Sequence, residues 1–172
     1  MNPLLQPIFA RRSVRRYRPG DIPEDAVRDL LEAAMAAPSA CAKDPWELIV
    51  VRSRATREAI AAALPNGKML PQAAVGIVVC GDLKRAHAGE LSFLLQDCAA
   101  AIENLLLAAQ TLGLGACWLG VHPRADRVAH IQALFRLPDH ILPVSVVALG
   151  LPDETPSPRT RYAASCVHRE TW

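Results

Sequence analysis

Seven consecutive residues, Arg11 to Tyr17, are the first part of the chain whose side chains suggest chemistry. They read Arg-Arg-Ser-Val-Arg-Arg-Tyr and bring together four guanidinium groups and a serine hydroxyl. Arg presents a rigid fork of donors that matches phosphate oxygens in a bidentate way, and closely spaced Arg and Ser can surround one dianion. A run of this kind is also typical of a solvated face, a nucleic-acid patch or a targeting element. The segment therefore predicts an anion site, to be weighed against these alternatives.

The composition of the whole chain weakens the alternatives. The 19 Lys and Arg residues face 17 Asp and Glu, so the formal charge is only +2 over 172 residues, and aromatic residues make up 5%. Non-specific nucleic-acid binding usually needs a larger excess of cations and aromatics for base stacking. Twin arginines can open an export signal, but the residues from Ser13 to Pro23 are polar and supply no apolar segment. We expect a cytoplasmic protein that binds neither nucleic acid nor a membrane.

The cysteines and histidines are not spaced like a disulfide framework or a metal site. The five cysteines are spread widely and form no C-x-x-C, and the five histidines show neither H-x-x-x-H nor H-E-x-x-H. Disulfide scaffolds and zinc sites normally show such spacing. We expect ordinary thiols and no metal centre.

Hydrophobic periodicity predicts helices and strands that alternate along the chain. We expect helices at 3–11, 24–36, 54–64, 90–112 and 124–135, and strands at 46–51, 73–80, 116–121 and 143–149. The strand at 73–80 is nearly all apolar, which is typical of a strand buried on both faces. This order indicates an α/β or α+β sheet in one domain. With 51% hydrophobic residues, the chain is apolar enough for a subunit interface to share the burial.

The helix expected at 90–112 carries one narrow polar seam. Its polar pairs, Gln96-Asp97, Glu103-Asn104 and Gln110-Thr111, recur every seven residues, which is two helical turns. The rest of the circumference is mainly Leu, Ala, Ile and Cys, so we expect a central or interface helix. The polar pairs interrupt the apolar run well short of the ~20 residues that a membrane span needs.

The chain after Leu149 changes character and predicts an arm. Pro152, Pro156 and Pro158 stiffen an extended stretch that leads to Arg159-Thr160-Arg161-Tyr162. A segment with few apolar residues gains little by folding alone, so it either stays mobile or lies over another surface, such as a second subunit. A frayed basic tail is the alternative.

Taken in order, these and several further motifs resemble the nitroreductase family of FMN-dependent oxidoreductases in its short form, over essentially the whole chain. The motifs are the arginine run, Ala37-Pro38-Ser39-Ala40 followed by Pro45-Trp46-Glu47-Leu48-Ile49-Val50-Val51, Lys68-Met69-Leu70, Gln96-Asp97-Cys98-Ala99-Ala100-Ala101 leading to Asn104-Leu105-Leu106-Leu107-Ala108-Ala109, Gly113-Leu114-Gly115-Ala116-Cys117-Trp118-Leu119-Gly120, and Arg159-Thr160-Arg161-Tyr162. The resemblance implies an α+β fold with a central mixed sheet flanked by helices. It also implies a single FMN-binding domain over 1–172, with the arm at 152–172 crossing to the partner of an intertwined homodimer that holds two FMN at its interface.

The resemblance assigns roles to residues by their position in these motifs. The expected cofactor-binding residues are Arg11, Arg12, Ser13 and Arg15, with Arg161 or Arg159 from the arm, for the phosphate and ribityl chain; Pro38, Ser39 and Ala40, given by the partner, against the isoalloxazine ring; Lys68 and Asn66 beside its pyrimidine end; and Leu119 and Gly120 at N5. Without the resemblance, Lys68 after Asn66-Gly67 reads as a solvated turn residue, and the glycines from 113 to 120 lack a dinucleotide-binding spacing. The family often has Asn and Gln where this chain has Ala42 and Asp44, so flavin contacts from 41 to 44 stay open.

The chemistry implied is ping-pong hydride transfer from NADH or NADPH, through the flavin, to a small acceptor such as a nitroaromatic compound or a quinone. The cofactor carries this chemistry, so we nominate no side-chain acid, base or nucleophile. A flavin carrier or sensor that does not turn over, and a relative that uses reduced FMN for dehalogenation or flavin breakdown, remain alternatives. Salt-dependent binding to DNA would revive a nucleic-acid-binding module.

Overall fold

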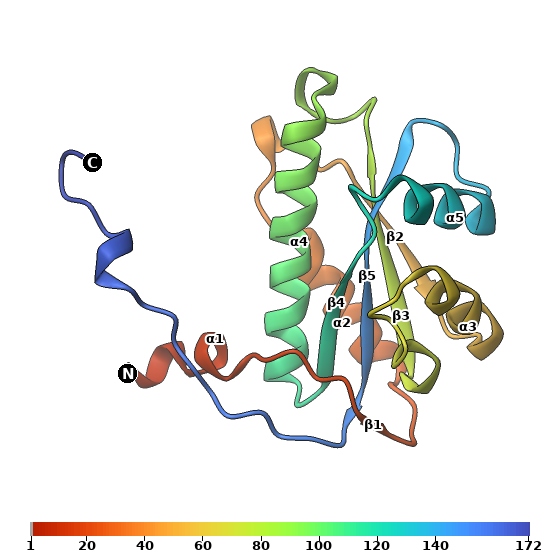
Figure 1. Ribbon diagram of the computed structural model, residues 1–172, viewed down its shortest axis with the longest axis horizontal. Coiled ribbons are helices and arrows are strands. Elements are labelled where there is room, and N and C mark those ends of the chain that lie inside the picture. The colour runs from red at the N-terminus through yellow and green to blue at the C-terminus, as the bar shows by residue number, and fades with distance from the viewer. Residues whose placement is uncertain (1) are drawn as a thin grey trace.

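The computed structural model describes residues 2–172 and shows a sheet between two layers of helices (Figure 1). The helices are α1 (Gln6–Ala10), α2 (Glu24–Met35), α3 (Arg54–Ala63), α4 (Leu91–Thr111) and α5 (Ala125–Phe135), and the strands are β1 (Tyr17–Arg18), β2 (Trp46–Val51), β3 (Val75–Asp82), β4 (Gly115–Gly120) and β5 (Ile141–Pro152). Each helix and strand expected from periodicity is present within a few residues, and only β1 had no counterpart among the predicted elements.

Strand β5 is the centre of the sheet. The strand order is β1-β5-β3-β2, and β4 also pairs with β5. Every ladder between the described strands is antiparallel, and parallel pairing within residues 2–172 is limited to one isolated bridge between Ser13 and Ala116. The α+β class is confirmed, but the expectation of a mixed sheet is corrected. Alternating helices and strands fix the order of elements along a chain, not the direction in which each strand enters the sheet.

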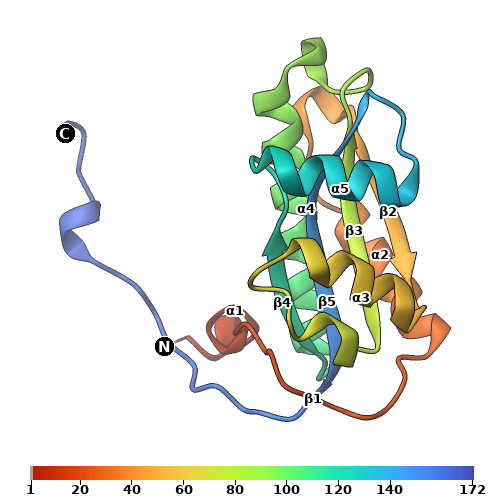
Figure 2. The same cartoon turned by 45° about the vertical axis from the view of Figure 1, so that its right-hand side comes forward.

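The two faces of the sheet bury two separate sets of side chains. Along β3, Ile77 and Val79 pack into the core shared with α2 and α4, whereas Val78 and Cys80 pack into the core shared with α3 and α5. Successive side chains of a strand point to opposite faces, so a strand covered on both sides must be apolar throughout. Figure 2 shows the two helical layers on either side of the strands. The prediction that this strand is buried on both faces is confirmed.

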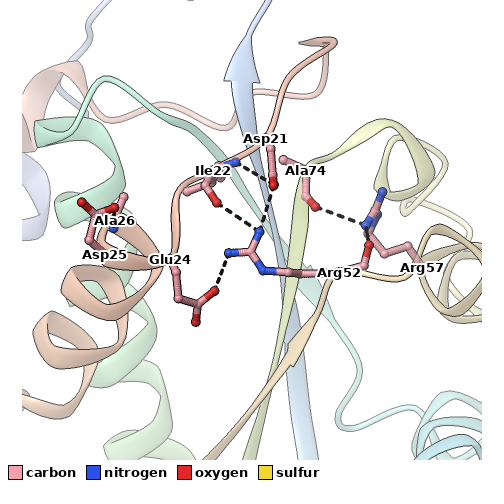
Figure 3. Close-up of polar contacts among 8 residues, drawn as sticks. All are labelled: Asp21, Ile22, Glu24, Asp25, Ala26, Arg52, Arg57 and Ala74. Carbon is pink, nitrogen blue, oxygen red and sulfur yellow. Dashed lines mark hydrogen bonds and ion pairs between the residues drawn. The ribbon is translucent and has the colours of Figure 1, made fainter.

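Two arginines join the strand β2 to its neighbours (Figure 3). Arg52 donates to Asp21 Oδ1 at 2.9 Å and to Glu24 Oε2 at 2.8 Å, which ties the end of β2 to the start of α2. Arg57 is buried and donates to the carbonyl of Ala74 at 3.1 Å and to that of Arg52. These bonds tie the end of β2 to the start of α2, and α3 to the residue that precedes β3.

The polar seam of α4 is used for contacts inside the molecule. Asn104 donates to the carbonyl of Ala33 in α2 at 3.1 Å, and Glu103 pairs with Arg11 at 3.2 Å. Asp97 is buried and accepts a hydrogen bond from Ala40 N–H at 2.9 Å. By length and composition α4 could span a membrane, but it packs against α2 and the sheet as a core helix.

The arm leaves the sheet after β5. From Asp153 onward it forms no further strand, and its last third runs clear of the helices and the sheet (Figure 1). Its first part lies beside the N-terminal segment, where Arg159 N–H donates to the carbonyl of Phe9 at 3.3 Å and Arg12 donates to that of Ser157. The crossing of this arm to a partner stays a prediction.

Candidate functional site

The segment that carries Arg15 is held against the sheet by two glycines. A Cβ added to Gly115 would lie 2.7 Å from Val14 Cγ1, and one added to Gly150 would lie 2.7 Å from Tyr17 Cδ1. Such distances are shorter than real contacts, so only glycine lets this segment lie so close to β4 and β5. Val14 and Tyr17 are thereby fixed on either side of Arg15.

Glu154, at the base of the arm, fixes the backbone of the same segment. Its Oε1 accepts hydrogen bonds from the N–H of Arg15 at 2.5 Å and of Arg16 at 3.2 Å. The bond from Arg15 N–H, with the nearby guanidinium groups, lowers the pKa of the Glu154 carboxyl below its usual value. Its charge therefore holds the arm to the arginine run.

A cavity of about 430 Å³ opens beside this segment, at the edge strand β4. Four of the predicted cofactor-binding residues line it: Arg15, Asn66, Leu119 and Gly120. The others are Leu64, Gly67, Cys117, Trp118 and Arg127. Its volume falls within the range of small-molecule sites, and two arginines line it without any acidic side chain. The cavity suits an anionic ligand with an apolar body.

The backbone at Gly120 is open to this cavity. A Cβ added there would meet nothing within 4 Å, so neither packing within the chain nor a positive φ accounts for the glycine. Close approach of a ligand to the backbone is a common reason for such a glycine. The Gly120 carbonyl accepts a hydrogen bond from Arg127 Nη1 at 2.8 Å, which fixes the orientation of this peptide.

Lys68 lines a second cavity, also of about 430 Å³, that adjoins the first through Arg15. Its other lining residues are Arg16, Tyr17, Met69, Gln72 and Asp153. Tyr17 donates to the carbonyls of Val14 at 2.8 Å and Ala148 at 3.3 Å, and burial raises the pKa of its hydroxyl. The structure thus brings Arg15, Asn66 and Lys68 to one side of the molecule, together with Leu119 and Gly120.

The remaining arginines gather where the arm passes the N-terminal segment. The neighbouring charges of Arg161 and Arg12 lower the pKa of the Arg159 guanidinium. Like charges held close together raise the free energy of the charged forms, and an anion among them would relieve it. Arg11 differs because its guanidinium pairs with Glu103, and Ser13 pairs with Ala116 of β4 through its backbone.

A sequence profile described as the Nitroreductase family matches the chain over residues 8–67 and 62–151. The chain belongs to this family. A protein of Methanothermobacter thermautotrophicus, provisionally named an NADH dehydrogenase/NAD(P)H nitroreductase, is 43% identical over 169 residues, which cover 98% of this chain and 87% of the relative. A structure from Parabacteroides distasonis with the same provisional name is 38% identical, with a TM-score of 0.93 and full coverage of both chains. A provisionally named nitroreductase of Desulfovibrio desulfuricans, solved in complex with FMN, is 31% identical, with a TM-score of 0.85, covering 100% of this chain and 99% of that one.

The segment that the family resemblance assigns to the partner's flavin lies elsewhere in this chain. Pro38, Ser39 and Ala40 line neither of the two cavities. Ser39 Oγ donates to Asp44 Oδ1 at 2.6 Å, and Ala40 N–H donates to Asp97 as described above. One chain therefore does not bring all the predicted residues together, because this loop and the arm residues Arg159 and Arg161 line neither cavity.

The loop that departs from the family pattern has an unusual backbone. Cys41, Ala42 and Asp44 have φ values of 51°, 50° and 48°, in the left-handed region that non-glycine residues seldom adopt. Asp44 N–H donates back to Ser39 Oγ at 2.9 Å, which closes the loop on itself. A backbone held in this region is a feature of turns and of binding sites alike.

Sequence reasoning missed several residues of the cavity. Trp118 and Cys117 stand inside a motif that carried the family resemblance, so their neighbours Leu119 and Gly120 could have indicated them. Burial raises the pKa of the Cys117 thiol, while the nearby Arg15 and Ser13 oppose that rise. Arg127 has no such signal, because it comes from α5 and reaches Gly120 only through the fold.

Proposed function

We propose that this protein is an FMN-dependent NAD(P)H oxidoreductase that passes electrons to a small acceptor, such as a nitroaromatic compound or a quinone, by a ping-pong mechanism. The observation that carries the proposal is the convergence of Arg15, Asn66, Lys68, Leu119 and Gly120 on two adjoining cavities. The family resemblance gives these residues to different parts of one flavin, and they come from separate segments of the chain. The names of the relatives, which include an NAD(P)H nitroreductase and a complex with FMN, support the same assignment.

The residues present suit FMN at both of its ends. The Arg12, Arg159 and Arg161 cluster and Arg15 would hold the phosphate, which carries close to two negative charges at neutral pH. The open backbone at Gly120 would accept a flat ring at close range. When bound, FMN would supply hydride acceptance at N5 and return of the electrons to the acceptor.

The residues of the chain would bind FMN, orient its ring and stabilise the negative charge that the ring gains on reduction. A cation at Lys68 would stabilise the negative charge that develops at the pyrimidine end of the ring on reduction. The N–H of Gly120 would serve as a backbone donor that needs no side-chain ordering, and the carbonyl of the same residue is held by Arg127. No side-chain acid or base is assigned to the reaction.

The site is completed by a second subunit in this proposal. Leu4 and Ile8 of the N-terminal segment are 86% and 53% exposed, and Leu91 and Phe93 at the start of α4 are also exposed. Large apolar side chains that lie exposed on the N-terminal segment and on α4 are typical of surfaces that a partner covers. A homodimer would bring Pro38, Ser39 and Ala40 of one chain to the flavin of the other. A cytoplasmic location stays a prediction from the sequence.

An anaerobic titration tests the proposal. Purified protein loaded with FMN is titrated with NADPH and, separately, with NADH, while the visible spectrum is recorded. Bleaching of bound flavin supports the oxidoreductase. Flavin that binds but stays oxidised indicates the carrier or sensor, which the unusual loop at 41–44 would favour. Failure to bind FMN would overturn the proposed function.

A further inference from the structure

The cavity at β4 that Gly120 lines, called the Gly120 cavity from here on, contains one cationic side chain to which the proposed flavin site gives no ligand. Arg127 and Arg15 are the cavity's two charged residues, and the proposed FMN site uses Arg15. Arg127 is half-buried, and no ion pair among residues 2–172 involves it. The one hydrogen bond that its guanidinium makes in that part of the chain goes from Nη1 to the Gly120 carbonyl. A guanidinium has five N–H donors, so most of its capacity remains free.

The position of Arg127 beside Gly120 indicates which bound molecule its guanidinium would contact. It touches the peptide that the proposed function sets at flavin N5, whereas the FMN phosphate belongs with the arginine cluster of the arm. Hydride enters and leaves the flavin at N5, so the nicotinamide and the acceptor must both come to this end. A cation beside Gly120 therefore faces the molecule that exchanges electrons with the flavin, rather than the flavin's own phosphate.

We propose that Arg127 binds an anionic group of that second molecule, so that the site prefers substrates with carboxylate or phosphate oxygens near the reacting ring. This inference rests on the proposed function. Guanidinium pairs with such oxygens in a bidentate way, and a partly desolvated cavity without acidic side chains strengthens the pairing. Trp118, which lines the same cavity and is 39% exposed overall, would add apolar surface for the uncharged part. The anionic oxygens come from two sources, a carboxylate on the acceptor or a phosphate of the nicotinamide dinucleotide.

Pairs of substrates that carry the same reacting group but differ in charge test whether charge alone affects the rate. With FMN-loaded protein, kcat/KM is measured for 4-nitrobenzoate and for uncharged 4-nitrobenzyl alcohol as acceptors. Reduction of the flavin is measured with NADH and with uncharged 1-benzyl-1,4-dihydronicotinamide as reductants. We expect Arg127→Gln to lower the ratio of the rate constant for the charged substrate to that for its uncharged counterpart about tenfold, since a hydrogen bond between charged groups is lost.

Two further variants define the cause. Arg127→Lys should restore part of the preference, because it keeps the charge without the fork. Arg124→Gln is the matched control: it removes the same charge at the exposed start of α5, away from the cavity, and should change neither ratio. A loss confined to 4-nitrobenzoate places the anion on the acceptor, and a loss confined to NADH places it on the dinucleotide. Equal losses for charged and uncharged substrates would show that Arg127 acts only through Gly120 and would overturn the inference.

A measurement without turnover keeps this inference separate from the proposed function. In flavin-free protein, 4-nitrobenzoate should quench the fluorescence of Trp118 at lower concentration than 4-nitrobenzyl alcohol does, and Trp118→Phe identifies that signal. The preference should vanish in Arg127→Gln and persist in Arg124→Gln. If FMN never binds, the proposed function fails while this titration still decides the role of Arg127. A quench that shows no preference for charge in the unaltered protein contradicts it.

Discussion

Lys68 is exposed and lines the cavity that adjoins the Gly120 cavity through Arg15. We predict that Lys68→Met leaves FMN bound but lowers its two-electron reduction potential by about 30 mV, because about 1.4 kcal/mol of stabilisation of the reduced form is lost. Reduction by NADPH should slow about tenfold for the same reason. Spectroelectrochemistry and stopped-flow absorbance measure the two effects.

Lys84→Met is the matched control, since Lys84 is exposed and lines neither cavity. It should leave the potential and the rate unchanged. Identical potentials for the Lys68 variant and the unaltered protein would return Lys68 to the class of solvated turn residues.

The paired arginines at the start of the run are predicted to act on FMN affinity and not on folding. Arg11→Ala combined with Arg12→Ala should weaken FMN binding at least tenfold, because a charge-assisted hydrogen bond from Arg12 to phosphate, worth about 1.5–3 kcal/mol, is lost together with the positive charge of Arg11. Both side chains are only partly buried, so the urea midpoint should hardly move. Fluorescence titration of FMN measures the affinity. Arg28→Ala, on the exposed face of α2, is the control, and an affinity unchanged in the double variant would refute the phosphate assignment.

At the level of elements, Glu154 links the end of β5 to the segment that carries Arg15. Its pKa is lowered in the folded protein from the ordinary value of 4.5, chiefly by the hydrogen bond from Arg15 N–H. The unfolded chain then binds the proton more readily, so stability due to Glu154 is present above about pH 4.5 and is lost as the pH falls through the folded value. We predict that the difference in unfolding free energy between the unaltered protein and Glu154→Gln shrinks below pH 4.5.

Urea unfolding at several pH values between 3 and 7 measures this difference. Glu58→Gln serves as the control, because Glu58 makes only an exposed i,i+4 pair with Arg54 on α3. A gap between the unaltered protein and Glu154→Gln that stays constant across this range would mean that the carboxylate does not hold the arm.

The elements that the sequence could predict are those whose pattern is local. The seven-residue recurrence of polar pairs predicted a mostly buried helix; in the single chain eight of the 21 residues of α4 are buried, and the polar seam contacts α2 and Arg11. Strand β1 could not be predicted, because two residues gain their pairing only from the far end of β5. Strand direction and the reach of Arg127 to Gly120 also depend on contacts distant in sequence. The motifs carried most of the candidate site, and tertiary contacts supplied the rest.

For the whole molecule, the open question is how residues that lie apart in one chain form one site. Arg15, Asn66 and Lys68 line the adjoining cavities, whereas Pro38 to Ala40 do not. The exposed apolar side chains of the N-terminal segment and of α4 would be covered if a second copy docked there. In such a homodimer each flavin would receive Arg11 and Arg12 from one chain and its small-residue loop from the other.

Mixed dimers test this arrangement directly. One chain carries Arg11→Ala with Arg12→Ala, and the other carries Ala40→Trp, whose bulk would block the approach of a flat ring. Each variant alone should bind little FMN. In a mixed dimer, one site combines both defects and the other combines intact arginines with an intact loop, so we predict one tightly bound FMN per mixed dimer, with reduction by NADPH restored at that site. Differently tagged chains, co-expressed and purified through both tags, allow the flavin to be counted by absorbance. If the loop served its own chain, both sites would be defective and the mixed dimer would remain empty.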